Sequence, residues 1–339
     1  MGVNLSGILQ RHEVSIKDFS GQTLAIDAYN IIYQFLSNIR QPDGSPLVDD
    51  SGRITSHISG MFYRTISLID SGIKPIYVFD GKPSKLKNRE LEERKLMREK
   101  SRMQLEEAMV EGDMERVRSL SARINYITRE TVDDLKKLLD LMGVPYVQAP
   151  SEGEAQAARL STYTFIYGVV SQDFDSLLFG AKRLLRNFTF SGKRKLPGRN
   201  VYINVKPEYI DLKDNLSALH ITREQLVDIG ILVGTDFNRG VKGIGAKTAL
   251  KLVKTYGNIY GVMKARGLRI ENVDEIRDLF LNPEVIDVKE IEAKPVNAEG
   301  LIEFLCDEHS FSRERVSHYI EILKRGYGVQ SQKSLDRFF

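Results

Sequence analysis

Apolar residues follow two different periods along the first two thirds of the chain. Short apolar runs predict buried strands, whereas apolar residues three and four positions apart predict amphipathic helices. The predicted strands span residues 23–27, 76–79, 144–147, 165–170 and 184–190, and the predicted helices span residues 56–70, 131–142 and 152–160. Because strands and helices alternate, we predict an α/β fold with a mainly parallel, twisted sheet and helices on both faces.

Two segments differ from this core in composition. Residues 83–130 are nearly all charged or polar, with Lys and Arg interleaved with Glu, and residues 234–252 form a Gly-punctuated turn between two amphipathic helices. We therefore predict a core made of residues 1–82 and 131–233, a charged helical insertion at 83–130, a hairpin region with the C-terminal helices at 234–326, and a flexible tail at 327–339.

The composition narrows the class of protein. The 339 residues are 42% hydrophobic, which is enough for a sizeable core, and no run approaches the roughly 18 apolar residues of a membrane span. The net charge is only +3, so overall basicity does not by itself indicate a nucleic-acid partner. The single cysteine, Cys306, excludes an intrachain disulfide and favours a reducing compartment. Since the N-terminus lacks a secretion signal, we expect a cytoplasmic protein without a membrane partner.

Acidic residues stand where predicted strands and helices begin or end. They are Asp27, Asp80, Glu152, Glu154, Asp173 and Asp175, with Asp236 as a seventh that spacing alone leaves insecure. Ligands of parallel sheets bind at the carboxyl ends of the strands, and three of these carboxylates lie at such ends. A lone aspartate after a strand is usually a turn or cap residue. That explanation weakens when it must be invoked separately for six positions.

The spacing within the clusters suits a metal site. Asp173 and Asp175 are two residues apart, so in extended backbone they point to one side. Glu152 and Glu154 cannot share a helix face at that spacing, and we expect them at the irregular entry to a helix. Mg²⁺ takes oxygen ligands and few direct carboxylates, so seven exceed the needs of one ion. Two ions could activate water and stabilise the leaving oxygen of a phosphoryl displacement, which predicts a metal-dependent phosphodiesterase.

At these residues the chain closely resembles the flap endonucleases, structure-specific nucleases of the 5′-nuclease superfamily with a PIN-like core. The resemblance spans nearly the whole chain, and its segments are Met1-Gly2-Val3, Ile26-Asp27-Ala28, residues 56–65, residues 72–83, residues 149–155, Ser171-Gln172-Asp173-Phe174-Asp175 and residues 234–238. The lack of a basic extension after Phe339 is more similar to the archaeal than to the eukaryotic branch.

The resemblance implies a function and a ligand set. The family cuts 5′ single-stranded DNA flaps at their junction with duplex, in replication (Okazaki fragment maturation) and repair, and has an associated 5′–3′ exonuclease activity. It implies that all seven carboxylates, Asp236 included, hold two Mg²⁺ ions, for which Mn²⁺ can substitute. It also implies that Gly2 and Tyr33 contact the DNA, Tyr33 by stacking near the cut, although Tyr33 could equally be a core aromatic. We expect a monomer that acts at the nucleoid of a prokaryote.

The charged insertion has two readings. The residues alone favour a solvated helix with ion pairs four residues apart, and a basic gateway for single-stranded DNA is the functional alternative. In the resembling family the insertion forms a helical arch, and Lys87 and Arg94 match a lysine and an arginine that reach the scissile phosphate. Cations beside a phosphoryl transition state would neutralise developing charge, so we expect catalytic roles for both residues, together with Asp80 and Glu152.

The Gly-rich turn at residues 240–248 is a near miss for a phosphate-binding P-loop. Ala246 interrupts the Gly-Lys-Ser/Thr run that a P-loop requires, and no strand precedes it. A helix–hairpin–helix that binds duplex phosphates without reading sequence fits better than an ordinary turn. Its predicted DNA-binding residues are Gly240, Lys242, Gly243, Gly245 and Lys247. The family's version of this motif also holds a monovalent cation, typically K⁺.

The last eight residues have the spacing of a peptide that binds a sliding clamp of the PCNA type. The four positions are Gln332, Leu335, Phe338 and Phe339. Exposed phenylalanines at a polar terminus make sense as anchors in a partner's hydrophobic pocket. The alternative is a tail that folds back on its own domain.

Three other functions remain open from the residues. A related exonuclease or gap endonuclease would use the same carboxylates. A P-loop-type NTPase is disfavoured by Ala246. A clamp-bound DNA scaffold without catalysis would not need the carboxylates for its activity.

Overall fold

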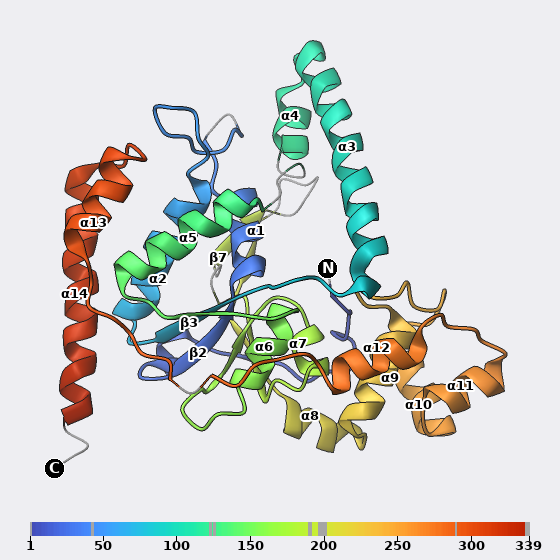
Figure 1. Ribbon diagram of the computed structural model, residues 1–339. Helices are drawn as coiled ribbons and strands as arrows, with labels where there is room; N and C mark the ends of the chain where they lie inside the picture. Colours follow the sequence, from blue (N-terminus) through green and yellow to red (C-terminus); the bar gives the residue numbers. More distant parts are fainter. Residues whose placement is uncertain are drawn as a thin grey trace.

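A seven-stranded sheet forms the centre of the computed structural model (Figure 1). The structure describes residues 2–41, 44–121, 124, 127–188, 192–195, 202–288 and 290–335. The strand order is β1-β9-β6-β5-β2-β3-β4. The five strands from β6 to β4 are parallel, and β9 and β1 continue the sheet antiparallel at one edge. The predicted α/β class with a mainly parallel sheet is confirmed.

The five parallel strands are short and match the predicted runs to within a few residues, whereas the two antiparallel edge strands and a separate two-stranded pair were not predicted. Their bounds are β1 (His12–Glu13), β2 (Thr23–Asp27), β3 (Lys74–Phe79), β4 (Tyr146–Gln148), β5 (Gly168–Val170), β6 (Arg183–Arg186) and β9 (Glu208–Asp211), with β7 (Gly192–Lys195) and β8 (Tyr202–Val205) forming a separate antiparallel pair. The predicted strands at 165–170 and 184–190 are thus shorter in the structure.

Each central strand places alternate side chains in two different hydrophobic cores. In β3, Ile76 and Val78 enter one core while Tyr77 and Phe79 enter the other. In β2, Ala25 enters the first of these cores, and the residues before and after it enter the second. Side chains of a strand point alternately to the two faces. A continuous apolar run therefore indicates a strand that is covered by helices on both sides.

Helices cover both faces of the sheet. The first core packs the sheet against α6 (Gly153–Leu160), α7 (Asp175–Leu178), α9 (Arg223–Val233), α10 (Ala246–Tyr256), α11 (Ile259–Arg266) and α12 (Val273–Leu281). The second core packs it against α1 (Ala28–Asn38), α2 (Ser56–Asp70), α5 (Arg129–Met142), α13 (Ala298–Ile302), a π-helical turn (Glu303–Asp307) and α14 (Arg313–Leu335). The remaining elements of the body are a 3-10 turn (Ile16–Phe19) and α8 (Leu212–Leu219).

The strand order reverses between β2 and β5. From β2 the chain adds β3 and β4 on one side, and then crosses to add β5 and β6 on the other side. Where the order reverses, the connections leave in opposite directions and open a crevice at the carboxyl ends of the strands. Asp27 ends β2 and Asp173 follows β5, so both lie at this crevice.

The charged insertion is helical and projects from the body in Figure 1. It comprises a 3-10 turn, η2 (Lys85–Lys87), followed by α3 (Asn88–Glu111) and α4 (Met114–Ser121), and is called the arch below. Leu105 and Ala108 of α3 pack on Val117 and Leu120 of α4. Ser101 and Ala108 are the buried residues of α3, so most of the helix surface is open to solvent.

The last helix extends into the segment predicted as the tail. Residues 327–335, predicted as a flexible tail, continue α14 to Leu335. The apolar residues Val316, Ile320 and Leu323 anchor the helix in the second core, and no proline follows to interrupt it. The predicted clamp-binding residues Phe338 and Phe339 lie outside the described residues. Among the helices that the structure describes, none has the length and hydropathy of a membrane span.

Candidate active site

The seven predicted carboxylates gather at the carboxyl edge of the sheet. Asp27 is the N-cap of α1, Glu152 is the N-cap of α6 and Asp175 is the first residue of α7. Asp80 follows β3 directly, and Asp236 lies in the turn after α9. Glu152 therefore occupies the irregular entry to a helix, as the two-residue spacing from Glu154 requires. Strand ends and helix starts from five parts of the chain meet here.

A serine joins two of the carboxylates directly. The Ser171 hydroxyl lies 3.1 Å from Asp27 Oδ2 and 3.2 Å from Glu154 Oε1. Asn30 makes a similar link, since its backbone N–H donates to Asp27 Oδ1 at 3.1 Å and its side-chain amide to Asp173 Oδ2 at 3.1 Å. The motifs in the sequence predicted no role for either residue. Asn30 stands three residues after Asp27, the position whose N–H an N-cap aspartate binds. Its backbone contact with Asp27 could therefore have been predicted from the sequence.

The N-terminal segment contacts the same cluster from the far end of the chain. The backbone N–H of Gly2 donates to Asp173 Oδ1 at 3.2 Å, and that of Val3 donates to Asp175 Oδ1 at 2.8 Å. A Cβ on Gly2 would lie 2.9 Å from Asp173 Cβ and from Asp175 Cγ. Only glycine fits between these carboxylates.

The arrangement of Asp173 and Asp175 differs from the prediction. They do not point to one side of an extended strand, because β5 ends at Val170, Asp173 lies in the following turn and Asp175 begins α7. The two carboxylates are neighbours because the turn and the start of α7 both face the N-terminal segment. Long-range packing, not strand periodicity, sets their separation.

A second glycine, Gly153, leaves space for the carboxylate of Asp80. The Gly153 backbone N–H donates to Asp80 Oδ1 at 2.7 Å, and a Cβ on Gly153 would lie 2.4 Å from that oxygen. Asp80 thus supplies the hydrogen-bond acceptor for the first turn of α6, whose own N-cap residue makes no side-chain cap. This contact ties the end of β3 to the start of α6.

Crowding and burial disfavour ionisation of the cluster. Burial, with the nearby Asp80 and Asp173 carboxylates, raises the pKa of Asp27 to about 7. Burial also raises the pKa of Asp80 to about 6 and that of Asp175 to about 7. The pKa of Glu154 lies well above its ordinary value because the residue is buried beside Asp175 and Asp173. These carboxylates would be fully ionised at neutral pH only with added positive charge.

Two cations of the arch supply some of that charge. Lys87 Nζ lies 2.7 Å from Glu152 Oε2 and 3.9 Å from Asp236 Oδ2. Burial alone would lower the pKa of Lys87, but the carboxylates of Glu152 and Asp80 outweigh burial and raise this pKa. Arg94 donates to Asp236 Oδ2 at 3.1 Å and also pairs with Glu90 on its own helix. The base of the arch is thus held by the acidic cluster.

The donor set fits divalent cations. All seven side chains offer the hard carboxylate oxygens that Mg²⁺ prefers. The raised pKa values of Asp27, Asp80, Glu154 and Asp175 indicate that these four lack enough counter-charge. Among the described residues, no three acidic, histidine or cysteine side chains already form a coordination shell. Several of the carboxylate oxygens instead accept from Lys87, Arg94 and backbone N–H groups.

The Gly-rich segment forms a hairpin between two packed helices. It connects α9 to α10, with Gly245 as the N-cap of α10. Gly240 has φ +66°, and a Cβ there would lie 2.2 Å from the Val233 carbonyl oxygen. The Val241 N–H donates to the Leu232 carbonyl at 2.8 Å, so the turn folds back against the end of α9.

The hairpin exposes four of its five predicted DNA-binding residues. Lys242, Gly243, Gly245 and Lys247 are exposed, and a Cβ on Gly243 or Gly245 would meet no atom within 4 Å. No packing contact requires glycine at either position, but Gly243 has φ +83°, which favours glycine. The open space around both residues leaves room for close approach of a ligand. Tyr33, by contrast, is half-buried on α1.

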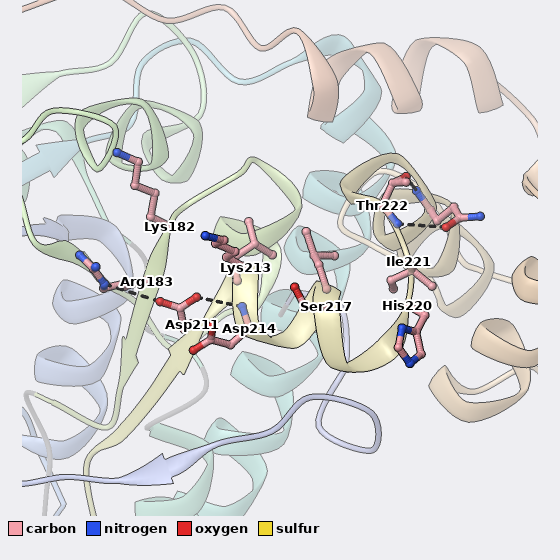
Figure 2. A pocket seen from close by; sticks show the side chains of 12 residues that line it. Lys182, Arg183, Asp211, Lys213, Asp214, Ser217, His220, Ile221 and Thr222 are labelled. Carbon is pink, nitrogen blue, oxygen red and sulfur yellow. Dashed lines mark hydrogen bonds and ion pairs between the residues drawn. The ribbon is translucent and has the colours of Figure 1, made fainter.

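A cavity of about 850 Å³ lies elsewhere, beside α8 and the start of α9 (Figure 2). Its polar residues already contact one another: Arg183 Nε lies 3.6 Å from Asp211 Oδ2, and the Asp214 N–H donates to Asp211 Oδ1 at 3.1 Å. None of the seven carboxylates lines it. This cavity is therefore separate from the acidic edge of the sheet.

Comparison with known proteins identifies the family. Two family models match the chain, the XPG N-terminal domain over residues 1–101 and the XPG I-region over residues 143–236. Flap endonuclease 1 of Picrophilus torridus is 58% identical over 339 residues, covering 100% of both chains. The chain belongs to the flap endonuclease family. Flap endonuclease 1 of Archaeoglobus fulgidus is 50% identical over 339 residues, also with 100% of both chains covered.

Solved structures agree with this assignment. Flap endonuclease-1 from Methanococcus jannaschii superimposes with a TM-score of 0.76 at 39% identity, covering 97% of this chain and 100% of that one. The catalytic core of Rad2 in complex with a DNA substrate shares the fold, with a TM-score of 0.69 at 21% identity over 92% of this chain and 96% of that one. The protein is a structure-specific flap endonuclease of the archaeal type, a metal-dependent nuclease of DNA replication and repair with exonuclease activity.

Proposed function

We propose that this flap endonuclease cuts the phosphodiester at the base of a 5′ flap with two Mg²⁺ ions held by the seven carboxylates. The observation that carries this proposal is that Asp27, Asp80, Glu154 and Asp175 lie together, shielded from solvent, with raised pKa values. Such a cluster needs more positive charge than the chain supplies. Bound Mg²⁺, or Mn²⁺ in its place, would supply that charge, activate a water nucleophile and stabilise the leaving oxygen.

The residues of the chain orient this site. Hydrogen bonds from Ser171 and Asn30 fix the directions of Asp27, Glu154 and Asp173. Groups that bind a metal ligand from behind restrict its rotation and tune its affinity. Ser176 adds a hydrogen bond to Glu154 Oε1 at 3.1 Å. We therefore assign positioning roles to Asn30, Ser171 and Ser176.

Lys87 and Arg94 would exchange partners when substrate and metal bind. In this structure they pair with Glu152 and Asp236. Metal binding to those carboxylates would release both cations for the phosphate, where they would neutralise charge in the transition state. They lie at the base of the arch, next to the acidic edge, which supports this role.

Further contacts would hold the DNA. Tyr33 would stack on a base or nucleotide near the cut, and Gly2 would keep the N-terminal backbone close to the same place. The hairpin residues Gly240, Lys242, Gly243, Gly245 and Lys247 would bind the duplex backbone, with K⁺ as the monovalent cation. The helix N-terminus at Gly245 is suited to a phosphate, and such contacts weaken as salt concentration rises.

The C-terminal residues would recruit the enzyme to a DNA sliding clamp. Gln332, Leu335, Phe338 and Phe339 have the required spacing, and aromatic anchors in a hydrophobic pocket commonly dominate the affinity of such contacts. We further propose that the enzyme works as a monomer on branched DNA in the cytoplasm, at the nucleoid.

A labelled 5′-flap substrate tests the catalytic proposal. Cleavage should require Mg²⁺ and should be lost in Asp80→Ala and in Asp80→Asn, while flap binding in both variants survives. Asp80→Asn is the matched variant, because its side-chain oxygen can still accept the Gly153 N–H. Cleavage that persists in Asp80→Asn would contradict the metal site. Nicked and gapped substrates compared in the same assay would separate flap from exonuclease and gap activity.

A further inference from the structure

Neighbouring residues of α3 reach into one short turn of the hairpin region. Arg94 donates to Asp236. Its neighbour Glu93 forms an ion pair with Arg239, which lies three residues after Asp236. Glu93 also lies 3.3 Å from Arg89 Nε on its own helix. Hydrogen bonding to Arg239 is the main reason that the pKa of Glu93 is lowered. We call Glu93 and Arg239 the arch–hairpin pair.

Hydrogen bonds and ring packing hold the turn that carries Arg239. The Thr235 N–H donates to the Asn238 carbonyl at 3.0 Å, and the Asn238 side-chain amide donates to the Ile231 carbonyl at 2.7 Å. Phe237 packs against Phe280 with ring centroids 5.4 Å apart. A turn bound in this way to α9 and α12 moves with the hairpin, so a contact with Arg239 is a contact with the duplex-binding region.

The arch–hairpin pair differs from the other links at this place. Lys87 and Arg94 bind Asp236, which is a proposed metal ligand, so these links compete with metal. Neither Glu93 nor Arg239 belongs to the acidic cluster. Their ion pair can therefore persist when the metal is bound and the two catalytic cations turn to the substrate.

We propose that Glu93 and Arg239 are positioning residues that keep the base of the arch, and with it Lys87 and Arg94, in register with the duplex-binding hairpin. This inference rests on the proposed roles of those two cations. An ion pair between exposed side chains is weak in general, but here it restrains the first turns of a helix whose remaining surface is largely open to solvent. A small restraint on such a helix changes how often the cations are correctly placed.

Charge reversal tests the arch–hairpin pair. The variants are Glu93→Arg, Arg239→Glu and the double variant that exchanges the two charges, and Glu106→Arg is the control. Glu106 lies on the same helix, and its ion-pair partner, Arg102, lies there too at 3.7 Å, so the control changes charge equally without touching the hairpin. The flap substrate is used with saturating enzyme, which isolates the single-turnover rate from binding.

We expect Glu93→Arg to lower the single-turnover rate by about two- to fivefold, the effect that one exposed ion pair supports, with unchanged flap affinity. The double variant should recover the rate, and Glu106→Arg should retain it. If the double variant recovers nothing, or if Glu93→Arg keeps the full rate, the inference is wrong. A loss of affinity in Arg239→Glu that persists in the double variant would instead identify Arg239 as a DNA contact and overturn the pairing role.

A distance measurement separates this inference from the catalytic proposal. In a Cys306→Ser background, labels placed at Met109 on α3 and Tyr256 on α10, which are 58% and 41% exposed, report the arch–hairpin distance without any cleavage. Glu93→Arg should broaden the distance distribution in the presence of Mg²⁺, and the double variant should narrow it again. An unchanged distribution would refute the pairing, whatever Lys87 and Arg94 do in catalysis.

Discussion

Lys87 Nζ lies 2.7 Å from the Glu152 carboxylate, so a lysine of the arch occupies the acidic edge of the sheet. Its side chain is only 16% exposed, and that of Glu152 only 10%. A buried pair of this kind leaves an uncompensated charge when one partner is removed. The contact couples the position of the arch to the state of the carboxylates.

Substitution of Lys87 should separate catalysis from folding. We expect Lys87→Ala to lower the single-turnover rate by about 10²–10³-fold, the usual cost of removing one group that stabilises transition-state charge. The exposed Lys85 lies on the same turn, and Lys85→Ala should have a much smaller effect. Quenched-flow cleavage at saturating enzyme measures both rates. Equal rates for the two variants would show that Lys87 has no catalytic role.

The stability of the metal-free protein should fall as pH rises. The folded pKa values of Asp27 and Asp175 are raised to about 7 and that of Asp80 to about 6, whereas an unfolded carboxyl titrates at about 4. Between these limits the folded state binds more protons than the unfolded state, so the free energy of unfolding decreases with pH. We expect chelator-treated protein to melt at a lower temperature at pH 8 than at pH 5.

Millimolar Mg²⁺ is the control for this titration. Ions that bind the folded state stabilise it by mass action, and they replace the protons as counter-charge. The melting temperature at pH 8 should therefore rise with Mg²⁺, with a smaller increase in Asp80→Asn. A melting temperature that does not change with Mg²⁺ at any pH would contradict a shared metal site.

Among the hairpin glycines, Gly240 should tolerate substitution by alanine least. An alanine there has an unfavourable positive φ and a Cβ 2.2 Å from the Val233 carbonyl oxygen, whereas Gly257 has φ +87° with no atom within 4 Å of an added Cβ. We expect Gly240→Ala to cost about 2–4 kcal/mol of unfolding free energy and Gly257→Ala about 1–2 kcal/mol. Chemical denaturation measures both. Duplex affinity should fall in Gly240→Ala, because the turn that presents Lys242 must move.

Several features of this protein could be predicted from the sequence. Alternating strands and helices predicted the sheet, and the aspartates after apolar runs marked its carboxyl edge. The two-residue spacing of Glu152 and Glu154 predicted that they lie at a helix entry, which the structure confirms. The resemblance to flap endonucleases rested on specific motifs along the whole chain, and the family comparisons confirm it.

Local patterns failed where distant segments decide the structure. The spacing of Asp173 and Asp175 suggested a shared side of a strand, but contacts with the N-terminal segment set their positions. Nothing in the local sequence of Glu93 indicated its partner, since Arg239 lies 146 residues further along the chain.

The sequence by itself determined that aspartates follow the central strands, that a glycine-containing turn joins two helices near residue 240 and which oxygen ligands the chain can offer, because these properties depend on neighbours a few positions away. Tertiary structure alone decided that the strand order reverses between β2 and β5, that Ser171 bridges Asp27 and Glu154, and that cations of the arch lie on the acidic edge. Those outcomes depend on how the helices pack on the two faces of the sheet, and the period of a single strand or helix carries no information about that packing.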